Sequence, residues 1–402
     1  SLQTDYGLRV LMLLASTALL TWVLAAVSCS NIARRNLLKE AQRPNEAEAA
    51  YRRALELKPD FADAHNDLGI LLKDLGKRPE AEAAYRRALE LRPQFSEAHN
   101  NLGILLLEME RFPEAEAAFR RAIELKPDFA DLHSNLGNLL KQTGLYPEAQ
   151  AAYRRAIELN PKDAMAHNNL GVLLQEAENL VEAEQAYRHA LAAKPDFGEA
   201  FSNQGILLQH MDQLTQAEAA YRHAIELKPD CTDARLNLGL LLLGVGRYAE
   251  AWAWHEARHV PDSKARKAMQ PHFDFPQWQG ESLAGKSLVV VLEQGYGDNI
   301  QFARYAPLLK ARGLNRLSFL QPAALIPLLA TVQGIDFITP DGASVPRHDY
   351  WCFPLSIPLH LGTTLETIPD ALPYVWALPE WVEHFAPSAA RLRQEQGQRA
   401  LL

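Results

Sequence analysis

The feature that most constrains this 402-residue chain is a 34-residue repeat that runs through its middle. Three kinds of residue recur at this step: the prolines Pro59, Pro93, Pro127, Pro161, Pro195 and Pro229, the glycines Gly69, Gly103, Gly137, Gly171, Gly205 and Gly239, and the aromatic residues Tyr51, Tyr85, Phe119, Tyr153, Tyr187 and Tyr221. One unit, ADAHNDLGILLKDLGKRPEAEAAYRRALELRPQF, holds two amphipathic stretches joined by a glycine-containing turn. One helix pair cannot bury its apolar face alone, but stacked pairs share a continuous core. The spacing therefore predicts an α-solenoid of antiparallel helix pairs.

The residue types within a unit fit this arrangement. Gly69 and Ala81 are small where we expect the two helices to cross, and Tyr85 and Leu89 are large enough to fill the space beside them. Pro93 ends the second helix because proline lacks the amide hydrogen that a helix interior needs.

These residues resemble the tetratricopeptide repeat family over residues 29–263, with about six full units and degenerate ends. The family usually has a tryptophan early in the first helix, and here that position holds His65, His99, His133 and His167. The Asn-Leu-Gly runs are similar to the repeats of the O-linked N-acetylglucosamine transferases and their bacterial relatives.

One asparagine per unit occupies the same helical position. These residues are Asn101, Asn135, Asn169, Asn203 and Asn237, with Asp67 at the matching place in the first unit. In the transferases that the repeats resemble, such a ladder lines the concave face and hydrogen-bonds an extended peptide backbone. Amides suit that task because they both donate and accept hydrogen bonds. The resemblance therefore implies a protein or peptide partner; the alternative is that these amides are polar groups satisfied within the helix pair.

The histidine column could suggest a metal site. Neighbouring repeats, however, stack about 10 Å apart, whereas one ion needs its ligands within about 2.1 Å. We therefore expect no metal, and nothing in the repeats suggests a cofactor.

Composition argues against other classes of function. The net charge of −8 and the pI near 5.9 disfavour a nucleic-acid partner, because such proteins normally present a basic face. Cys29, Cys231 and Cys352 lie far apart without a CxxC motif, so neither a disulfide scaffold nor a structural zinc site is expected.

The amino-terminal residues 8–28 have the apolar composition of a membrane-spanning segment. Residues 10–27 carry no charge, and as a helix they would rise about 27 Å, close to the roughly 30 Å of a hydrocarbon core. Arg34, Arg35 and Lys39 follow, which favours a cytoplasmic carboxyl side. We expect a transmembrane helix that anchors the chain in the inner membrane, with the repeats facing the cytoplasm. The alternatives are a signal or lipoprotein segment and a soluble packing helix in a cytoplasmic protein.

After residue 263 the period changes. Prolines interrupt the helical pattern, so residues 264–285 are expected to form a linker. The apolar run at 287–292 is typical of a buried parallel strand. Further strands are predicted at 317–320, 336–338 and 350–353, with helices at 299–311 and 322–332. This alternation predicts a partial, Rossmann-like α/β domain with a parallel sheet over residues 286–402.

The first predicted strand runs into the loop Glu293-Gln-Gly-Tyr-Gly-Asp298. Ligands of open α/β sheets bind outside the carboxyl ends of the strands. Glycines at such a loop let backbone amides approach a ligand, and a helix amino terminus favours anions. Taken alone the signal is ambiguous, because Asp298 could simply cap the helix that follows.

The segments EQGYGDNIQFARYAPLLKARG and PLSIPLHLGTTLETIPDALPY resemble the first half of a bacterial glycosyltransferase of the GT-B, heptosyltransferase-related type. In that family the aspartate after the first strand is the proposed catalytic base, and here it is Asp298. The acceptor loop implied by the resemblance comprises Gln294, Gly295, Gly297, Gln301 and Arg304.

The resemblance implies sugar transfer from a nucleotide sugar to a protein or glycan acceptor. A donor-binding second half is not recognisable before Leu402. This chain alone is therefore expected not to turn over, and a nucleotide-sugar donor is expected only in a longer protein. The alternative is a non-catalytic tetratricopeptide-repeat scaffold for protein–protein interaction, with the α/β part as an end cap.

Overall fold

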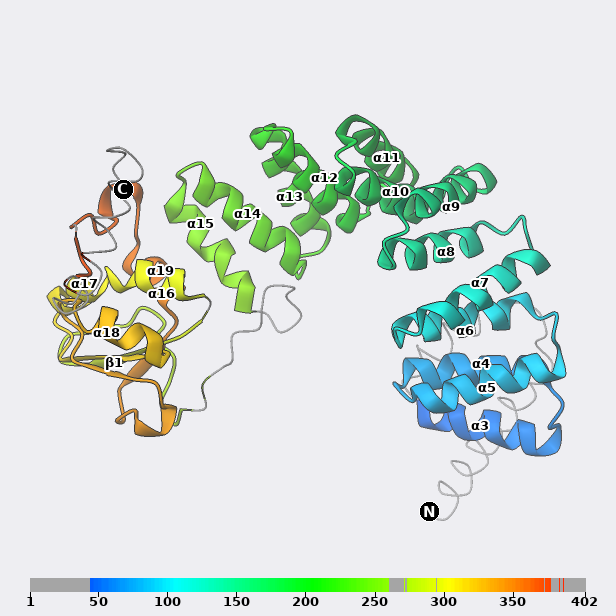
Figure 1. Ribbon diagram of the computed structural model, residues 1–402, viewed down its shortest axis with the longest axis horizontal. Helices are drawn as coiled ribbons and strands as arrows, with labels where there is room; N and C mark the ends of the chain where they lie inside the picture. The colour runs from blue at the N-terminus through cyan, green and yellow to red at the C-terminus, as the bar shows by residue number, and fades with distance from the viewer. Residues whose placement is uncertain are drawn as a thin grey trace, which may run out of the picture. The chain divides into compact units, whose positions relative to one another are not determined.

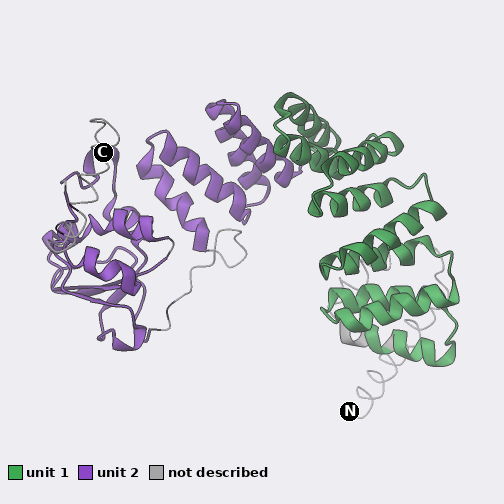
Figure 2. Cartoon of the chain, in the orientation of Figure 1, with its two compact units in different colours: residues 1–195 green, residues 196–402 purple. Residues whose placement is uncertain are grey.

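The computed structural model describes residues 44–259, 271, 273–293, 295–371, 373–376, 383 and 386 (Figure 1). The chain divides into two compact units, residues 1–195 (unit 1) and 196–402 (unit 2), as Figure 2 shows. The predicted transmembrane helix at residues 8–28 lies outside the described residues. Among the helices that are described, none is both long and apolar enough to cross a bilayer.

Unit 1 is a stack of antiparallel helix pairs. Its helices are α3 (Pro44–Leu57), α4 (Ala62–Asp74), α5 (Arg78–Leu91), α6 (Ser96–Glu108), α7 (Phe112–Leu125), α8 (Ala130–Gln142), α9 (Tyr146–Leu159), α10 (Ala164–Glu176) and α11 (Leu180–Ala193). The pairs α4–α5, α6–α7, α8–α9 and α10–α11 pack most extensively (Figure 1). The predicted solenoid is confirmed.

A glycine and an aromatic ring define the crossing inside each pair. A Cβ atom on Gly103 would lie 2.7 Å from Cε1 of Phe119, and the equivalent glycine–tyrosine pairs are as tight. Phe119 is fully buried, and burying such a side chain stabilises the fold by about 2–3 kcal/mol. The small–large pattern read from the sequence thus sets how closely the two helices approach.

The turn inside each pair holds one residue in the left-handed conformation. After α4 the amide of Lys77 donates to the carbonyl of Leu72, with Gly76 between them at φ +74°, which is the Schellman arrangement of a helix end. The later units place Glu110, Gly144, Glu178, Asp212 and Gly246 at this position, all with positive φ. Three of the six turns therefore lack the glycine that this conformation favours.

Ion pairs join the second helices of neighbouring pairs. Arg86 in α5 contacts Glu82 on its own helix at 2.8 Å and Glu114 in α7 at 3.2 Å. Arg52 and Arg222 repeat this arrangement. Because the arginine side chains keep about a third to a half of their surface exposed, each pair contributes at most about 1 kcal/mol.

Unit 2 begins with two more helix pairs and continues into a parallel sheet. Its helical part comprises α12 (Gly198–His210), α13 (Leu214–Leu227), α14 (Thr232–Gly244), α15 (Tyr248–His255) and the 3-10 turn η1 (Glu256–His259). The strands are β1 (Ser287–Val291), β2 (Arg316–Leu320), β3 (Phe337–Thr339) and β4 (Tyr350–Cys352), all parallel in the order β3-β2-β1-β4. Each lies within one residue of its predicted ends.

The connections between the strands are shorter and more broken than predicted. They contain α16 (Tyr296–Ala303), α17 (Ala306–Ala311), η2 (Ala323–Leu325), α18 (Ile326–Leu329), η3 (Gly342–Ser344), η4 (Pro354–Ser356), α19 (Ile357–Leu361) and η5 (Leu365–Thr367). The single helix predicted at 299–311 is wrong, because Pro307 lacks an amide hydrogen and stands in the first turn of a second helix, which begins at Ala306. The helix predicted at 322–332 shrinks to η2 and α18, with Pro327 at the same kind of start.

Part of the segment expected as a linker packs on the sheet. Trp278 is 2% exposed, and its amide donates to the carbonyl of Trp351 in β4 at 2.8 Å. Phe275 shares an apolar cluster with Val289 of β1. Residues 273–285 therefore belong to the α/β part of unit 2.

Candidate functional site

The asparagine column lies on the first helix of each pair. In α8 it follows the spacing i, i+4, i+7 through Asp131, Asn135 and Asn138, which places these residues on one side of the helix. The equivalent stripes of α4, α6 and α10 complete what we call the ladder face of unit 1. The first helices of neighbouring pairs contact one another, so their stripes adjoin.

Amide hydrogen bonds connect the stripes. Nδ2 of Asn101 donates to Oδ1 of Asn66 at 3.0 Å, and Nδ2 of Asn135 donates to Oδ1 of Asn100 at 2.8 Å. Asn169 is different, because its Nδ2 donates to Oδ1 of Asn138, also at 3.0 Å. Asn101, Asn135 and Asn169 thus form a ladder in which each bonds to the preceding repeat.

The ladder amides keep further hydrogen-bonding capacity. A carboxamide has two N–H groups and two acceptor lone pairs, and the bonds to the preceding repeat occupy one N–H of each. Asn101, Asn135 and Asn169 are half-buried, as are Asn203 and Asn237 at the same position in unit 2. The structure therefore brings the predicted residues to one partly exposed position per repeat, and peptide binding stays a prediction.

An aliphatic column runs beside the amides, three residues further along each helix. It consists of Ile70, Ile104 and Val172 in unit 1, all half-buried, and α8 interrupts it with Asn138. Ion pairs link the ends of the same helices, Lys73 with Glu108 at 3.1 Å and Lys141 with Glu176 at 2.9 Å.

The histidine column holds the chain that enters each pair. Nε2 of His99 lies 3.0 Å from the carbonyl oxygen of Pro93, and His65, His133 and His167 contact the corresponding prolines at 2.8–3.0 Å. Burial lowers the pKa of His99, so the neutral ring donates from Nε2. These histidines secure the turn before the helix.

The loop after β1 leads into α16, and Asp298 is not the N-cap that its alternative interpretation implied. Gly295 is the N-cap and Asp298 lies in the first turn, where a carboxylate interacts favourably with the helix dipole. Asp298 is half-buried, and Gly295 and Gly297 are exposed. Gln294 lies outside the described residues.

The other predicted loop residues lie at the far end of α16. Gln301 is exposed in its last turn, and the guanidinium of Arg304 lies over the ring of Tyr374, 4.8 Å from its centroid. The start of α16 is fixed instead by Asn299, whose Nδ2 donates to the carbonyl of Gly295 at 2.8 Å. The structure thus separates Asp298 from Arg304 along the helix.

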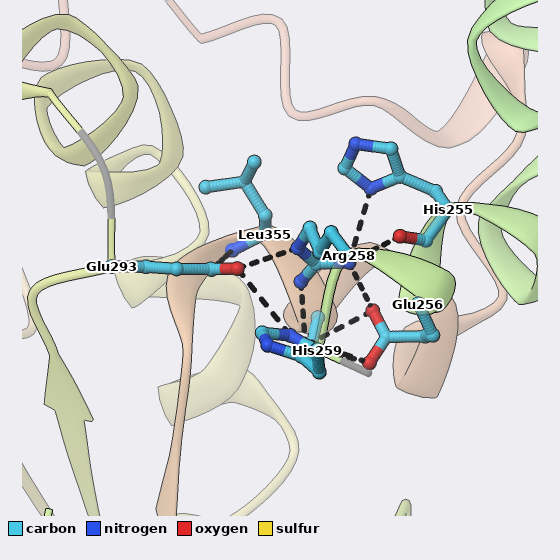
Figure 3. A network of polar contacts seen from close by, with 7 residues as sticks. His255, Glu256, Arg258, His259, Glu293 and Leu355 are labelled. Carbon is cyan, nitrogen blue, oxygen red and sulfur yellow. Dashed lines mark hydrogen bonds and ion pairs between the residues drawn. The ribbon is translucent and has the colours of Figure 1, made fainter. Parts of the chain in front are cut away.

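A buried ion pair that the sequence did not predict lies at the first residue of this loop (Figure 3). Nε of Arg258 in η1 donates to Oε1 of Glu293 at 2.5 Å, and the two side chains are 2% and 1% exposed. Arg258 also contacts Glu256 at 2.6 Å and Ser356 at 2.9 Å. The end of the repeats is therefore bonded to the carboxyl end of β1.

The surroundings shift the titration of this network. Burial, with the charge of Arg258, lowers the pKa of His255 and of His259 to about 4. Burial raises the pKa of Glu293, although Arg258 opposes the shift.

The buried indole of Trp252 forms a second contact between the last helix pair and the α/β part, because it donates to the carbonyl of Thr363 at 2.9 Å. An acidic residue directly after an apolar strand is the one signal that could have pointed to Glu293.

The comparisons with known proteins agree with the helical part. The family model described as "Tetratricopeptide repeat" matches residues 67–129, 134–196 and 203–262, and one described as "TPR repeat" matches residues 36–76. The protein FlbA of Caulobacter vibrioides is 37% identical over 67 residues, which cover 16% of this chain and 11% of FlbA. The chain thus spans about a tenth of the length of that curated relative.

Solved structures of repeat proteins are also similar. YrrB, whose structure is described as that of a TPR protein with an unusual peptide-binding site, is 26% identical, with a TM-score of 0.37 and coverage of 46% of this chain and 95% of YrrB. A tetratricopeptide repeat protein from Parabacteroides merdae is 18% identical, with a TM-score of 0.48 and coverage of 58% and 93%. With the two family models together matching more than half of its residues, the chain belongs to the tetratricopeptide repeat family.

Proposed function

We propose that this chain is a protein-interaction scaffold whose ladder face binds an extended segment of a partner protein. The observation that carries the proposal is the row of half-buried amides that repeats once per helix pair and keeps hydrogen-bonding capacity beyond the bonds within the ladder. Stacked helices lie about 10 Å apart, and three residues of an extended chain span about the same distance. One amide per repeat therefore matches every third residue of such a segment.

The face also suits a peptide chemically. Amides bond to any backbone, and the neighbouring aliphatic side chains of Ile70, Ile104 and Val172 offer apolar contacts between the amides. Such a partner is held mainly by hydrogen bonds to its main chain, and apolar contacts with its side chains add to them.

The test is a direct binding measurement. Dodecapeptides selected from a random library on the full chain are labelled and titrated by fluorescence anisotropy. Asn135→Ala together with Asn169→Ala should weaken binding by about 1–3 kcal/mol in total, as expected for a few lost hydrogen bonds. Gln150→Ala, which removes an amide from the second helix α9 of the same pair, is the matched control. Unchanged binding with a lowered melting temperature would assign the ladder a structural role alone.

A second candidate is sugar transfer at the loop after β1. It is favoured by the parallel order β3-β2-β1-β4 and by the exposed glycines that begin α16 at the carboxyl end of β1, where open α/β sheets bind ligands. In a protein that transfers sugar, Asp298→Asn should lower the rate by about 10²–10⁴-fold if Asp298 is the general base. Near-normal transfer by that variant would leave Asp298 as a residue that stabilises the helix start.

A further inference from the structure

The α8–α9 repeat differs from the preceding repeats of unit 1 at four positions. The first difference is the loss of a basic side chain that forms an ion pair in those repeats. In the preceding repeat, Glu97 in the first turn of α6 pairs with Lys126 at 3.3 Å, and the repeat before that has the same arrangement. The corresponding residues of the α8–α9 repeat are Asp131 and Asn160. Within the described part of the chain, Asp131 has no ion-pair partner.

A second carboxylate lies near Asp131 instead. Asp163 is the N-cap of α10, and its side chain accepts a hydrogen bond from the amide of Ala166 at 3.0 Å. The side chain of Asp131 is exposed, and its partial desolvation, together with the charge of Asp163, raises its pKa. Neighbouring carboxylates repel each other, and a cationic group between them relieves the repulsion.

The third departure is a buried hydroxyl group. Ser134 occupies the position from which Asn66 and Asn100 accept the ladder bonds of the following repeats. Ser134 is 9% exposed, and its Oγ has no hydrogen-bond partner among the described residues. An unpartnered buried polar group is unfavourable, so this hydroxyl favours a further hydrogen-bond partner at this position.

The fourth departure makes the same stripe polar. Asn138 stands where the neighbouring repeats have Ile104 and Val172, and the hydroxyl of Tyr153 donates to its Oδ1 at 2.7 Å. Asn169 also donates its ladder bond to Asn138, whereas the preceding repeats use the position that Ser134 occupies here. Oδ1 of Asn138 therefore accepts two hydrogen bonds within the chain, and a polar side chain replaces the aliphatic one of the neighbouring repeats.

We propose that Asp131, Ser134 and Asn135, which we call the α8 subsite, bind the side chain of a lysine or arginine in an extended partner peptide. The proposal rests on the proposed function, because Asn135 holds the partner backbone. Asp131 lies one helical turn away, about 6 Å along the axis, a distance that the stem of either side chain can bridge. The carboxylate of Asp131 binds the cation, and the Ser134 hydroxyl and the amide oxygen of Asn135 accept its N–H groups.

The experiment measures charge preference at one position of the peptide. Each basic residue of a library-selected dodecapeptide is replaced in turn by norleucine, and the Kd for the full chain is measured by fluorescence anisotropy at low salt. We expect one position at which the replacement weakens binding about five-fold. Asp131→Asn should abolish this preference, and so should Asn160→Lys, which restores the cation that the preceding repeats have.

Glu97→Gln is the matched control, because the carboxylate of Glu97 already pairs with Lys126. It should leave the preference unchanged, and circular dichroism verifies that each variant is folded. One outcome would overturn the α8 subsite and leave the proposed function intact. In it the peptides bind and the ladder variants raise the Kd, but norleucine leaves the Kd unchanged at every position. Equal effects of Asp131→Asn and Glu97→Gln would also overturn the subsite. If no selected peptide binds the chain, both proposals are overturned.

Discussion

A Cβ atom on Gly137 would lie 2.7 Å from Cε1 of the Tyr153 ring and 2.8 Å from Cδ1. The same contact recurs through the stack, from Gly69 with Tyr85 to Gly205 with Tyr221. It changes at the last pair, where the atom nearest to a Cβ on Gly239 is the backbone nitrogen of His255, at 2.8 Å.

Gly137→Ala should therefore destabilise unit 1 by about 1–3 kcal/mol, since the added methyl group overpacks a buried ring. Circular dichroism during urea denaturation measures the change. Gly244→Ala is the control, because a Cβ there meets nothing within 4 Å; it should be neutral or stabilising by up to about 1 kcal/mol. Equal effects of the two substitutions would mean that the glycine–ring contact does not set the helix spacing.

The left-handed turn residues provide a prediction of opposite sign. Glu178→Gly should raise the free energy of unfolding by about 0.5–1 kcal/mol, because Glu178 has φ +59° and glycine adopts this conformation without strain. Gly144→Ala, at the same place one repeat earlier, should lower it by a similar amount. A loss of stability in Glu178→Gly would show that the glutamate side chain contributes more than the backbone strain costs.

Removing one partner of the buried ion pair should be costly. Arg258→Met leaves the Glu293 carboxylate buried without its cation, and we expect a loss of about 3–5 kcal/mol in unit 2. Adding Glu293→Gln should restore most of it. Six of the seven tryptophans lie in unit 2, so tryptophan fluorescence follows its unfolding. Failure of the second substitution to rescue the first would indicate that Arg258 acts through Ser356 and Glu256 instead.

Acid should destabilise the same region. The pKa of His255 and of His259 is about 4 in the folded chain and about 6.5 when unfolded. Below pH 6.5 the unfolded chain therefore binds more protons, so stability falls as the pH drops from 6.5 toward 4 and then levels off. The raised pKa of Glu293 acts in the opposite direction and offsets part of the loss.

Each histidine accounts for up to about 3 kcal/mol of this fall. His259→Gln should make the urea midpoint of unit 2 less sensitive to pH over this range, compared with the unchanged chain. A profile that keeps its full slope in His259→Gln would mean that His259 titrates normally.

Local patterns predicted the secondary structure better than the site. The 34-residue step is visible when the sequence is compared with itself, and the apolar run at 287–292 depends on neighbouring residues alone. Neither signal requires knowledge of a tertiary contact. The prediction of one helix over 299–311 is wrong because it relied on the apolar periodicity and not on Pro307. Proline lacks the amide hydrogen that the interior of a helix needs, so the helix ends before it.

The site depends on contacts that no local pattern encodes. Arg258 and Glu293 are 35 residues apart and meet only because η1 packs against the end of β1. The departures at Ser134, Asn138 and Asn160 are visible in the aligned repeats. Their significance appears once the structure shows that Asn66 and Asn100 accept the ladder bonds at the position of Ser134.

The attachment of the last helix pair determines how this array can change in length. Removing residues 96–129, one whole repeat, would bring Asn66 to the place of Asn100 beneath Asn135, so each remaining interface would join surfaces of the same kind. Removing residues 232–259 would instead strip Glu293 and Thr363 of Arg258 and Trp252. Whole repeats can therefore be removed from or inserted into the interior of the array with matched interfaces on both sides. The carboxyl-terminal pair cannot be removed in this way, because buried polar groups of the α/β part depend on it.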